Sequence, residues 1–465
     1  MSPSHLSSRF TGQFVRRGEA GYEDARVGRV FNARRPERFP AAVLLAADEA
    51  DVVAGVRLAS AEGLRVSVRA GGHSWAAWSV RDDALLIDLG AMRDIRYDAA
   101  TGIAAARPAV RGGTELEPFL ARRGRAFPAG HCESVGLGGY LLQGGQGWNG
   151  RAWGWGCENV VAIDAVTADG RQVHADDHEN ADLYWAARGA GPGFPAVVTT
   201  FYLRTYPQPP VMLQDTWTFR LDDAGPLLAW LHEVLPALDV TVEPVLAATR
   251  LPDVPLDPGV RRPEGTVLLL HTTAAGDSVG QVEQRLAPLQ AGPLTGRSLG
   301  HVRGLTSIAE ENTAQTMQNP EGYRYLADCT WTDAAAGQIA PALQRMWQEL
   351  PTEHSFSIWY GWAPARPLPD MAFSLEANVY LATYVIFTDP GDDGRYGDWI
   401  HSRTRELALA GCGAYLGDTD FRRRTDRFMS DEAYRRLGEV RARWDPDGTF
   451  CSYLALDGAP LNQHA

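Results

Sequence analysis

The stretch Phe127–Asn159, FPAGHCESVGLGGYLLQGGQGWNGRAWGWGCEN, has a composition that neither a buried core nor an exposed surface requires. It contains ten glycines, at positions 130, 136, 138, 139, 144, 145, 147, 150, 154 and 156. Each glycine costs roughly 0.5–1 kcal/mol relative to alanine in regular structure, so this density predicts positive φ angles or a close approach of the backbone to another group. The stretch is therefore expected to form a site lined by main chain.

The ligand that suits such a site is large and anionic. Glycine-rich turns expose amide N–H groups that cradle phosphates, and the interleaved aromatic side chains suit flat rings. Gly145–Gly150 also fits the G-x-G-x-x-G dinucleotide fingerprint, but the following Arg151–Gly156 is a poor helix, so a Rossmann fold is not favoured. Cys132 and Cys157 lack nearby histidine pairs, and we expect no metal site.

Length and composition limit the class of protein. A chain of 465 residues predicts two domains. A net charge of −13, from 44 basic and 57 acidic residues, argues against a nucleic acid or membrane partner. The absence of lysine excludes Schiff-base and P-loop chemistry. The five scattered cysteines and the lack of an apolar signal region predict a cytoplasmic protein, which we expect to be a monomer or homodimer.

The first part of the chain predicts short strands, helices and glycine turns. Strands are expected at 41–46, 65–69, 84–89, 96–98, 103–106, 160–168 and 196–203, and helices at 19–26, 48–62, 113–123 and 180–188. The first two strands and the helix between them form a βαβ unit. Its second strand runs into Ala70–Trp75, a glycine turn at a strand end, where open α/β sheets place ligands.

After Pro207–Pro210 the pattern changes to longer alternating strands. They are expected at 211–221, 245–249, 266–273, 356–362 and 378–387, with helices at 226–235, 278–286 and 341–349. This pattern predicts an antiparallel sheet backed by helices. From Cys412 the earlier pattern returns, with a helix at 431–444 and a tail at 449–456. We therefore expect an α+β fold in which 1–206 and 412–465 form one domain and 207–411 a second.

Two nucleophilic side chains bracket the expected phosphate cradle, since His73 follows one glycine turn and Cys132 lies in the other. Further motifs accompany them in a fixed order: Val68–Ser74, Gly130–Gly139, Gly144–Trp148, Cys157–Asn159, Val166–Gly170, Asp182–Ala186 and Trp444–Phe450. With this set, the chain resembles the berberine-bridge-enzyme-like branch of FAD-linked oxidases, in the vanillyl-alcohol-oxidase superfamily with a PCMH-type FAD-binding domain. The resemblance covers nearly the whole chain outside residues 210–350.

The resemblance implies a two-domain FAD-linked oxidase fold whose FAD is bonded covalently to both His73 and Cys132. It also implies further cofactor-binding positions: Arg69, Ala70, Gly71, Gly72, Ser74, Gly130, Ser134, Val135, Gly136, Gly138, Gly139, Gly144, Gly147, Trp148, Asn159 and Val198.

The catalytic base is expected to be Tyr415. The family's Tyr-x-Asn-Tyr is here Cys412-Gly-Ala-Tyr415, so the resemblance assigns the role to the tyrosine that remains. Plant members of the family often carry a glutamate base where this chain aligns Ala382. Strand alternation places four side chains of the last predicted strand on one face, Asn378, Tyr380, Ala382 and Tyr384. Tyr380 or Tyr384 is thus a candidate partner of Tyr415.

Candidate substrate residues lie in the second domain. Alternation puts Tyr360 and Trp362 on one face of a strand and Trp359 on the other; stacking on a flat or glycosidic substrate and packing in a sheet core both require such residues. Glu376 stands where many family members have arginine. Its carboxylate is expected to select a polyol or cationic substrate over an acidic one, and the alternative is a solvated surface charge. Asn378 is a further candidate substrate residue.

The resemblance implies an FAD-dependent oxidase that moves a hydride from a substrate C–H to flavin N5 and passes the electrons to O₂, giving H₂O₂. The expected substrate is a small molecule with a carbinol, in a sugar or a glycosylated natural product. Oxidative cyclisation or desaturation of a natural product in secondary metabolism is the alternative. A redox-neutral flavoprotein and a nicotinamide dehydrogenase are the competing classes.

Overall fold

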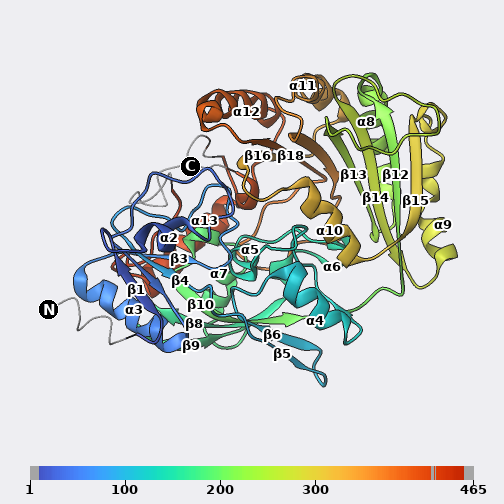
Figure 1. Cartoon of the computed structure of the whole chain (residues 1–465). Coiled ribbons are helices and arrows are strands. Elements are labelled where there is room, and N and C mark those ends of the chain that lie inside the picture. The colour runs from blue at the N-terminus through green and yellow to red at the C-terminus, as the bar shows by residue number, and fades with distance from the viewer. Residues whose placement is uncertain (1–9, 420–423, 425, 455–465) are drawn as a thin grey trace.

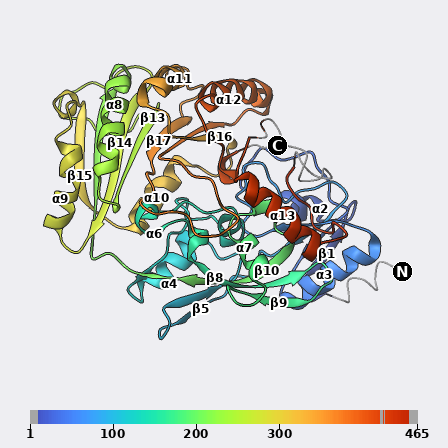
Figure 2. The ribbon, with the colours of Figure 1, turned by 180° about the vertical axis from the view of Figure 1, so that it is seen from behind.

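The computed structural model describes residues 10–419, 424 and 426–454. The last residues of the predicted tail, 455 and 456, lie outside the described residues. The described residues form two groups of sheets (Figure 1). The smaller sheets and the C-terminal helix form one group, and a seven-stranded sheet with its covering helices forms the other (Figures 1 and 2). The predicted α+β class and the two-part fold are confirmed.

A four-stranded sheet contains the predicted βαβ unit. Its strands lie in the order β1 (Gln13–Arg16), β2 (Ala42–Leu45), β4 (Leu85–Asp88) and β3 (Val66–Arg69). Strands β2 and β3 both run parallel to β4, which lies between them. Helix α3 (Glu49–Glu62) connects β2 to β3; it begins after Asp48, whose side chain accepts from Asp51 N, and ends at Gly63 with φ 67°.

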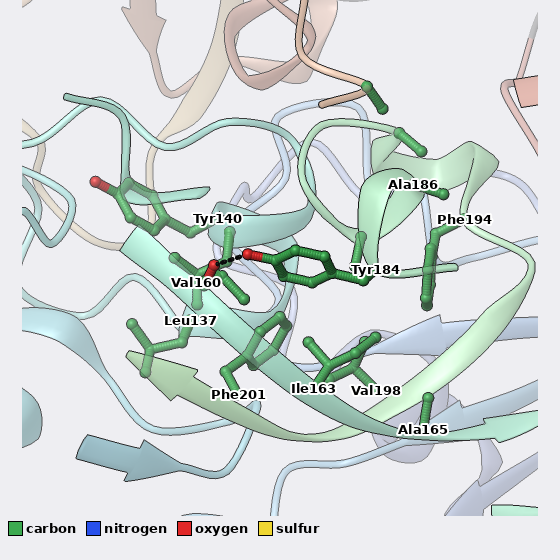
Figure 3. Close-up of a cluster of buried hydrophobic side chains, with 14 of the residues drawn as sticks. Leu137, Tyr140, Val160, Ile163, Ala165, Tyr184, Ala186, Phe194, Val198 and Phe201 are labelled. Atoms are coloured by element: carbon green, nitrogen blue, oxygen red, sulfur yellow. Dashed lines mark hydrogen bonds between the residues drawn. The ribbon is translucent and has the colours of Figure 1, made fainter. Parts of the chain in front are cut away.

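A five-stranded antiparallel sheet lies beside it. The order is β5 (Ile95–Asp98), β6 (Ile103–Ala106), β10 (Ala196–Arg204), β8 (Val160–Thr167) and β9 (Gln172–Ala175). Figure 3 shows the apolar side chains of β8 and β10 packed with α7 (Ala181–Ala187) and α5 (Leu137–Leu142). The Tyr184 hydroxyl donates to the Val160 carbonyl over 2.8 Å, so the one polar atom of this buried ring is satisfied.

The C-terminal segment returns to this group. Helix α13 (Asp431–Trp444) packs Leu437, Val440 and Trp444 into the same core as β8 and β10. In Figures 1 and 2 it lies among the N-terminal elements and away from α12, which precedes it in the chain. Short elements complete this part of the molecule: α2 (Tyr22–Val27), α4 (Glu117–Ala121), α6 (Gly150–Trp153), and the paired β7 (Arg125–Ala126) and β11 (Tyr206–Pro207).

The seven-stranded sheet is antiparallel throughout. Its order is β15 (Gly300–Thr306), β12 (Val211–Arg220), β14 (Val267–Gly276), β13 (Val242–Thr249), β17 (Phe356–Gly361), β18 (Val379–Phe387) and β16 (Arg324–Thr332). One face is covered by α8 (Ala224–Val234), α9 (Val279–Gln290), α11 (Ala336–Gln348) and α12 (Asp393–Ala408). The other face is turned toward the first group of sheets, with α10 (Ile308–Gln318) between them (Figure 1).

In the seven-stranded sheet and its helices, the sequence patterns missed four elements, β15, α10, β16 and α12, and placed the starts of β13 and α11 too late. Helix α11 was expected to begin at Pro341 but begins at Ala336, because Ile339 and Ala340 also belong to its buried face. In β16 the polar Asp328 interrupts the apolar alternation; its carboxylate is paired with the buried Arg424. The domain division after residues 206 and 411 stays a prediction. No described helix is both long and apolar enough to span a membrane.

Candidate active site

A cavity of about 580 Å³ lies where the two groups of sheets meet. Its walls include the glycine turns Ala70–Trp75 and Gly130–Gly139, the uncovered face of the seven-stranded sheet, and the segment Tyr415–Asp418 that follows it in the chain. Helix α10 and residues of 191–198, 251–255 and 450–452 also line the cavity. Residues far apart in sequence are thus brought to one enclosed space.

The two glycine turns are in direct backbone contact. A Cβ added to Gly71 would lie 2.6 Å from Gly136 N, and a Cβ on Gly138 would lie 2.6 Å from the Cβ of Ala70. Only Gly72 in these turns has a positive φ, of 81°. The glycines of the second turn are therefore required mainly by close approach, since side chains there would separate the turns and close the cradle.

The cradle suits a phosphate-bearing, flat cofactor. Among the described residues, the main-chain N–H groups of 71–74 have no hydrogen-bond acceptor in the protein. Ser67 Oγ, Gln143 Oε1 and Gln146 Nε2 are buried in the cavity wall without a partner. Buried polar groups normally find partners, so these atoms indicate a bound molecule with both donors and acceptors, as FAD has.

His73 and Cys132 both line this cavity. The His73 ring stacks on Phe31 at 4.1 Å, and its Nε2 lies 2.8 Å from Ser134 Oγ. Burial, with the charge of Arg111, lowers the pKa of His73 to about 3, so its imidazole is neutral. Burial also raises the pKa of the Cys132 thiol to about 12. The sequence prediction that both nucleophiles face one ligand is consistent with this placement.

Most predicted cofactor positions line the cavity: Arg69, Ala70, Gly71, Gly72, Ser74, Gly130, Val135, Gly136, Gly138, Gly139, Trp148 and Val198. The guanidinium of Arg69 is nevertheless occupied, because it pairs with Asp88 and donates to the carbonyls of Ala25 and Arg26. This residue can offer the cavity only its main chain.

Four predicted cofactor positions do not line the cavity. Ser134 Oγ lies 2.8 Å from His73 Nε2. Gly144 and Gly147 are required by packing, since a Cβ would lie 2.9 Å from the Phe373 ring at Gly144 and 2.3 Å from the Ala129 carbonyl oxygen at Gly147. The Asn159 amide donates to the carbonyls of Trp153 and Trp155. These positions shape the loop that carries the cavity wall.

The three candidate catalytic tyrosines meet at the segment Tyr415–Asp418. Tyr415 belongs to this segment, and Tyr380 and Tyr384 bond to its last residue. The hydroxyls of Tyr380 and Tyr384 donate to Asp418 Oδ2 over 2.7 and 2.9 Å. Tyr415 Oη accepts from the Gly145 amide over 3.1 Å. Tyr415, Tyr384 and Asp418 line the cavity, whereas Tyr380 lies behind them. Strand alternation therefore placed Tyr380 and Tyr384 on the correct face.

The electrostatics of this cluster oppose free ionisation. Burial, with the charge of Asp418, raises the pKa of Tyr415 well above its usual range, although the Gly145 amide acts in the opposite direction. Burial also raises the pKa of Asp418, despite hydrogen bonds from Trp75 and the two tyrosines. A tyrosine acts as a base at neutral pH only if its pKa is lowered or if loss of its own proton is coupled to the transfer; the pKa of Tyr415 is raised, which leaves the coupled route.

Only one of the three candidate aromatic substrate residues reaches the cavity. Tyr360 lines it and donates to Glu243 over 3.1 Å. Trp362 lies on the same side but is fully buried against Trp155, with ring centroids 4.9 Å apart. Trp359 faces the covering helices, as alternation predicted, and packs near His232 of α8. Trp359 and Trp362 are core residues here, so the packing interpretation holds for both.

Glu376 and Asn378 are corrections to the sequence analysis. Glu376 Oε2 accepts from the indole N–H groups of Trp155 and Trp362 over 2.8 and 2.7 Å and is not part of the cavity wall. Asn378 precedes β18, is exposed, and binds Asp333 on the surface. The strand begins one residue later than expected, so Asn378 falls outside the alternating register.

Sequence reasoning missed several polar residues of the cavity. The buried Glu243 carboxylate accepts hydrogen bonds from the main-chain N–H of Asn149 and from the Tyr360 hydroxyl. His271 lies between Thr216 and Glu311 on the sheet side. Asp418 could have been identified from its position three residues after Tyr415. For Glu243 and His271, the only indication in the sequence was a polar residue within a strand. No group of three or more described His, Cys, Asp or Glu side chains is suited to a metal ion.

The comparisons with known proteins agree with this site. Residues 40–176, which include both glycine turns, match the FAD binding domain family. The FAD-linked oxidoreductase nodO of Hypoxylon pulicicidum is 37% identical over 441 residues, which cover 94% of this chain and 95% of that protein. A carbohydrate oxidase of Microdochium nivale is 36% identical over 198 residues, 42% of this chain and 39% of that one. The fold and site thus define an FAD-dependent oxidoreductase.

A solved structure extends the likeness of the fold to almost the entire chain. The berberine-bridge-enzyme-like protein 1 of Physcomitrella patens aligns with a TM-score of 0.83 over 97% of this chain and 98% of that chain, at 19% identity. This protein belongs to the family of FAD-linked oxidoreductases that includes nodO.

Proposed function

We propose that this oxidase removes a hydride from a C–H bond of a small organic substrate, with FAD attached through both His73 and Cys132. The observation that carries the proposal is one cavity that joins both nucleophile-bearing turns to Tyr415, Asp418 and the uncovered sheet face. FAD held in this cavity would supply the redox chemistry, which is acceptance of the hydride and reoxidation by O₂ with formation of H₂O₂. The protein supplies attachment, orientation and proton transfer.

His73 suits attachment because its imidazole is neutral and nucleophilic and lies in the cavity wall. Cys132 lies in the same wall, and its thiol must lose its proton as the bond forms, because the thiolate is the nucleophile. His73 Nε2 is engaged with Ser134, which leaves Nδ1 for a covalent bond. Each new bond replaces a flavin C–H and a side-chain N–H or S–H, and O₂ accepts the two electrons and two protons released. Two bonds would hold the ring system at fixed depth in the cavity.

Tyr415 is the proposed acceptor of the substrate proton. Because its raised pKa keeps the Tyr415 hydroxyl protonated, we propose that this hydroxyl releases its own proton to water in the same step in which it takes the substrate proton and the hydride leaves the substrate. The Gly145 amide donates to Tyr415 Oη and stabilises negative charge there. Tyr384 with Asp418 is the second route, since Asp418 Oδ2 holds the Tyr384 hydroxyl and both line the cavity.

Two classes of substrate remain for this proposal. The first is the carbinol of a sugar or glycosylated compound, which the similarity to the Microdochium nivale carbohydrate oxidase supports. The second is a natural product that undergoes cyclisation or desaturation. We also propose a cytoplasmic location, which the five free cysteines support.

The test is the absorption spectrum of the purified protein before and after acid precipitation, together with an assay of H₂O₂. Yellow colour in the washed pellet and substrate-dependent O₂ consumption with equimolar H₂O₂ are the expected results. Flavin that bleaches with substrate but yields no H₂O₂ would contradict the oxidase proposal. If the enzyme converts a substrate while the flavin stays oxidised, the reaction is redox-neutral, as in the alternative class.

A further inference from the structure

The side chain of His73 is held on two sides. Its Nε2 lies 2.8 Å from Ser134 Oγ, and its ring stacks on Phe31 with 4.1 Å between centroids and 21° between planes. In the described part of the chain, no hydrogen bond reaches the other ring nitrogen, Nδ1. Stacking fixes the plane of the imidazole, and the hydrogen bond fixes which of its edges faces the second glycine turn. Nδ1 is therefore the nitrogen that is left for a bound molecule.

The chain segment that carries Phe31 is bound to the first glycine turn. The Phe31 amide donates to the Gly72 carbonyl over 3.0 Å. The next residue, Asn32, is fully buried, and its Nδ2 donates to the carbonyls of Trp75 and Tyr325 over 2.9 Å each. Movement of the stacked ring away from the imidazole would break these bonds and leave buried groups without partners, which is costly. The Phe31 ring is thus a fixed support.

Close contact of the two glycine turns brings Ser134 to His73. Ser134 lies two residues after Cys132 in the second turn. A Cβ added to Gly136 would lie 2.6 Å from Gly71 Cα, so neither glycine has room for a side chain. Larger residues there would separate the turns and lengthen the 2.8 Å distance between Ser134 Oγ and His73 Nε2. The glycines therefore also align the serine with the histidine.

The partner of Nε2 decides where the imidazole of His73 carries its proton. Burial lowers the pKa of His73 to about 3, so the neutral ring has one N–H. If this N–H is at Nε2, it donates to Ser134 Oγ and leaves a lone pair on Nδ1. If Ser134 instead donates to Nε2, the proton lies on Nδ1, and Nδ1 cannot form a bond with carbon. The serine hydroxyl can take either role, because it is both a donor and an acceptor.

We propose that Ser134 is a positioning residue for the attachment of FAD, because it holds His73 with the proton on Nε2 and the lone pair on Nδ1. This inference rests on the covalent attachment in the proposed function. As the bond between Nδ1 and a flavin carbon forms, the Nε2–H and flavin C–H bonds break, and O₂ takes up the two electrons and two protons. The partly exposed Ser134 hydroxyl accepts the Nε2 proton and passes its own proton to water, and it then donates to the new lone pair on Nε2.

The first experiment measures how fast FAD becomes attached through each side chain. Full-length protein produced without flavin in a riboflavin-requiring host is mixed with FAD, and the flavin fluorescence of acid-precipitated samples is followed in time. In Cys132→Ala, which attaches FAD only through His73, adding Ser134→Ala should slow attachment by about tenfold, because one hydrogen bond is lost. In His73→Ala, which attaches FAD only through Cys132, the same change should leave the rate unaltered. Equal slowing in both backgrounds, or no slowing in the first, would refute the proposal.

Two further variants separate the hydroxyl from the shape of the side chain. Ser134→Thr keeps the hydroxyl, and Ser134→Val has the same shape without it, so any effect of the larger side chain on packing is common to both. In the Cys132→Ala background, attachment should be about tenfold faster in Ser134→Thr than in Ser134→Val. Equal rates in these two variants, at equal thermal stability, would remove the hydroxyl from the explanation and overturn the proposal.

A second measurement locates the proton without any flavin. In flavin-free protein with isotope-labelled histidine, nitrogen NMR distinguishes a ring nitrogen that carries a proton from one that has a lone pair, and His73→Ala identifies the signals of His73. The proton is expected on Nε2 in the parent and shared between both nitrogens in Ser134→Val. A parent ring with its proton on Nδ1 would contradict the assigned role of Ser134.

Failure of this inference can be told apart from failure of the proposed function. A parent protein that binds FAD but loses all flavin on precipitation has no covalent bond, which refutes the attachment and this inference with it. A parent that keeps its flavin, while Ser134→Ala attaches FAD through His73 at the same rate, refutes only the role of Ser134.

Discussion

Tyr384 donates a hydrogen bond of 2.9 Å to Asp418, which joins the seven-stranded sheet to the turn that follows Tyr415. Tyr380 donates to the same carboxylate oxygen, and Trp75, from the first glycine turn, donates to the other at 2.8 Å. One side chain thus connects the sheet, the C-terminal segment and the turn that carries His73. Such a carboxylate is suited both to hold the site together and to take part in proton transfer.

Asp418→Asn should remove the pH dependence that this carboxylate gives to stability, while its NH₂ group leaves either Trp75 or the two tyrosines without their acceptor. Burial raises the pKa of Asp418 above its value of 3.8 in an unfolded chain, so its stability contribution is fully present below pH 3.8 and is lost as the pH rises through the raised pKa. Asparagine does not ionise. The melting temperature of the variant minus that of the parent should therefore rise with pH above about 4, by about 2 °C in total, from a starting value that the lost acceptor makes negative.

The matched control is Asp177→Asn, an exposed carboxylate outside the cavity. The difference in melting temperature between Asp177→Asn and the parent should not increase with pH. A difference for Asp418→Asn that falls with pH would mean that the three donors outweigh burial. In the same variant, flavin reduction should slow if Tyr384 and Asp418 carry the substrate proton.

Tyr415→Phe should slow anaerobic flavin reduction by about 10²–10⁴-fold, the span typical of a lost general base. The ring remains, but the Gly145 amide loses its acceptor, so unfolding free energy should also fall by about 1–3 kcal/mol. Stopped-flow reduction under saturating substrate measures the rate, and the spectrum of precipitated protein checks the tether. Tyr384→Phe is measured for comparison. A larger decrease in the rate of flavin reduction in Tyr384→Phe than in Tyr415→Phe would assign the proton transfer to Tyr384 and Asp418.

His73→Ala and Cys132→Ala should each leave flavin in the acid-precipitated pellet, and only the double variant should release it. The reason is that the two side chains reach the cavity from separate turns, so the loss of one does not move the other. Cys157→Ala, a buried cysteine of the same stretch that does not line the cavity, is the control. Complete release from either single variant would show one covalent bond.

Local patterns carried much of the fold and of the flavin side of the site. Glycine density located both turns, and alternation gave the correct face for Tyr360, Tyr380 and Tyr384. These features depend on residues close in sequence, where backbone period and turn chemistry decide the outcome.

Long-range pairing could not be predicted in this way. The donors to Glu243 come from Asn149, 94 residues away, and from Tyr360, 117 residues away. The Asp328–Arg424 pair that satisfies a polar residue in β16 spans 96 residues. A single sequence gives no signal for which polar residue in a strand will meet a partner, so β16 and the polar wall of the cavity were missed.

Variants of Glu376 test whether this carboxylate contacts the substrate or supports the buried core. Its Oε2 holds the indole N–H groups of Trp155 and Trp362, so we expect a structural role. Glu376→Gln keeps a carbonyl oxygen for both donors and, because burial raises the pKa of Glu376, removes a charge that is unfavourable at neutral pH. This variant should match the parent in kcat/KM for neutral and cationic substrates, with equal or slightly higher stability.

Glu376→Leu should behave differently from Glu376→Gln, because it leaves both indole N–H groups buried without an acceptor. Its unfolding free energy should fall by about 2–4 kcal/mol in denaturant titrations, while kcat/KM per folded, flavin-loaded protein stays near that of the parent. Glu353→Leu, at an exposed position, is the control and should change neither quantity. A tenfold loss of kcat/KM in Glu376→Gln at unchanged stability would place this carboxylate on the substrate after all, because only a contact with substrate would respond to charge while the tryptophans keep their acceptor.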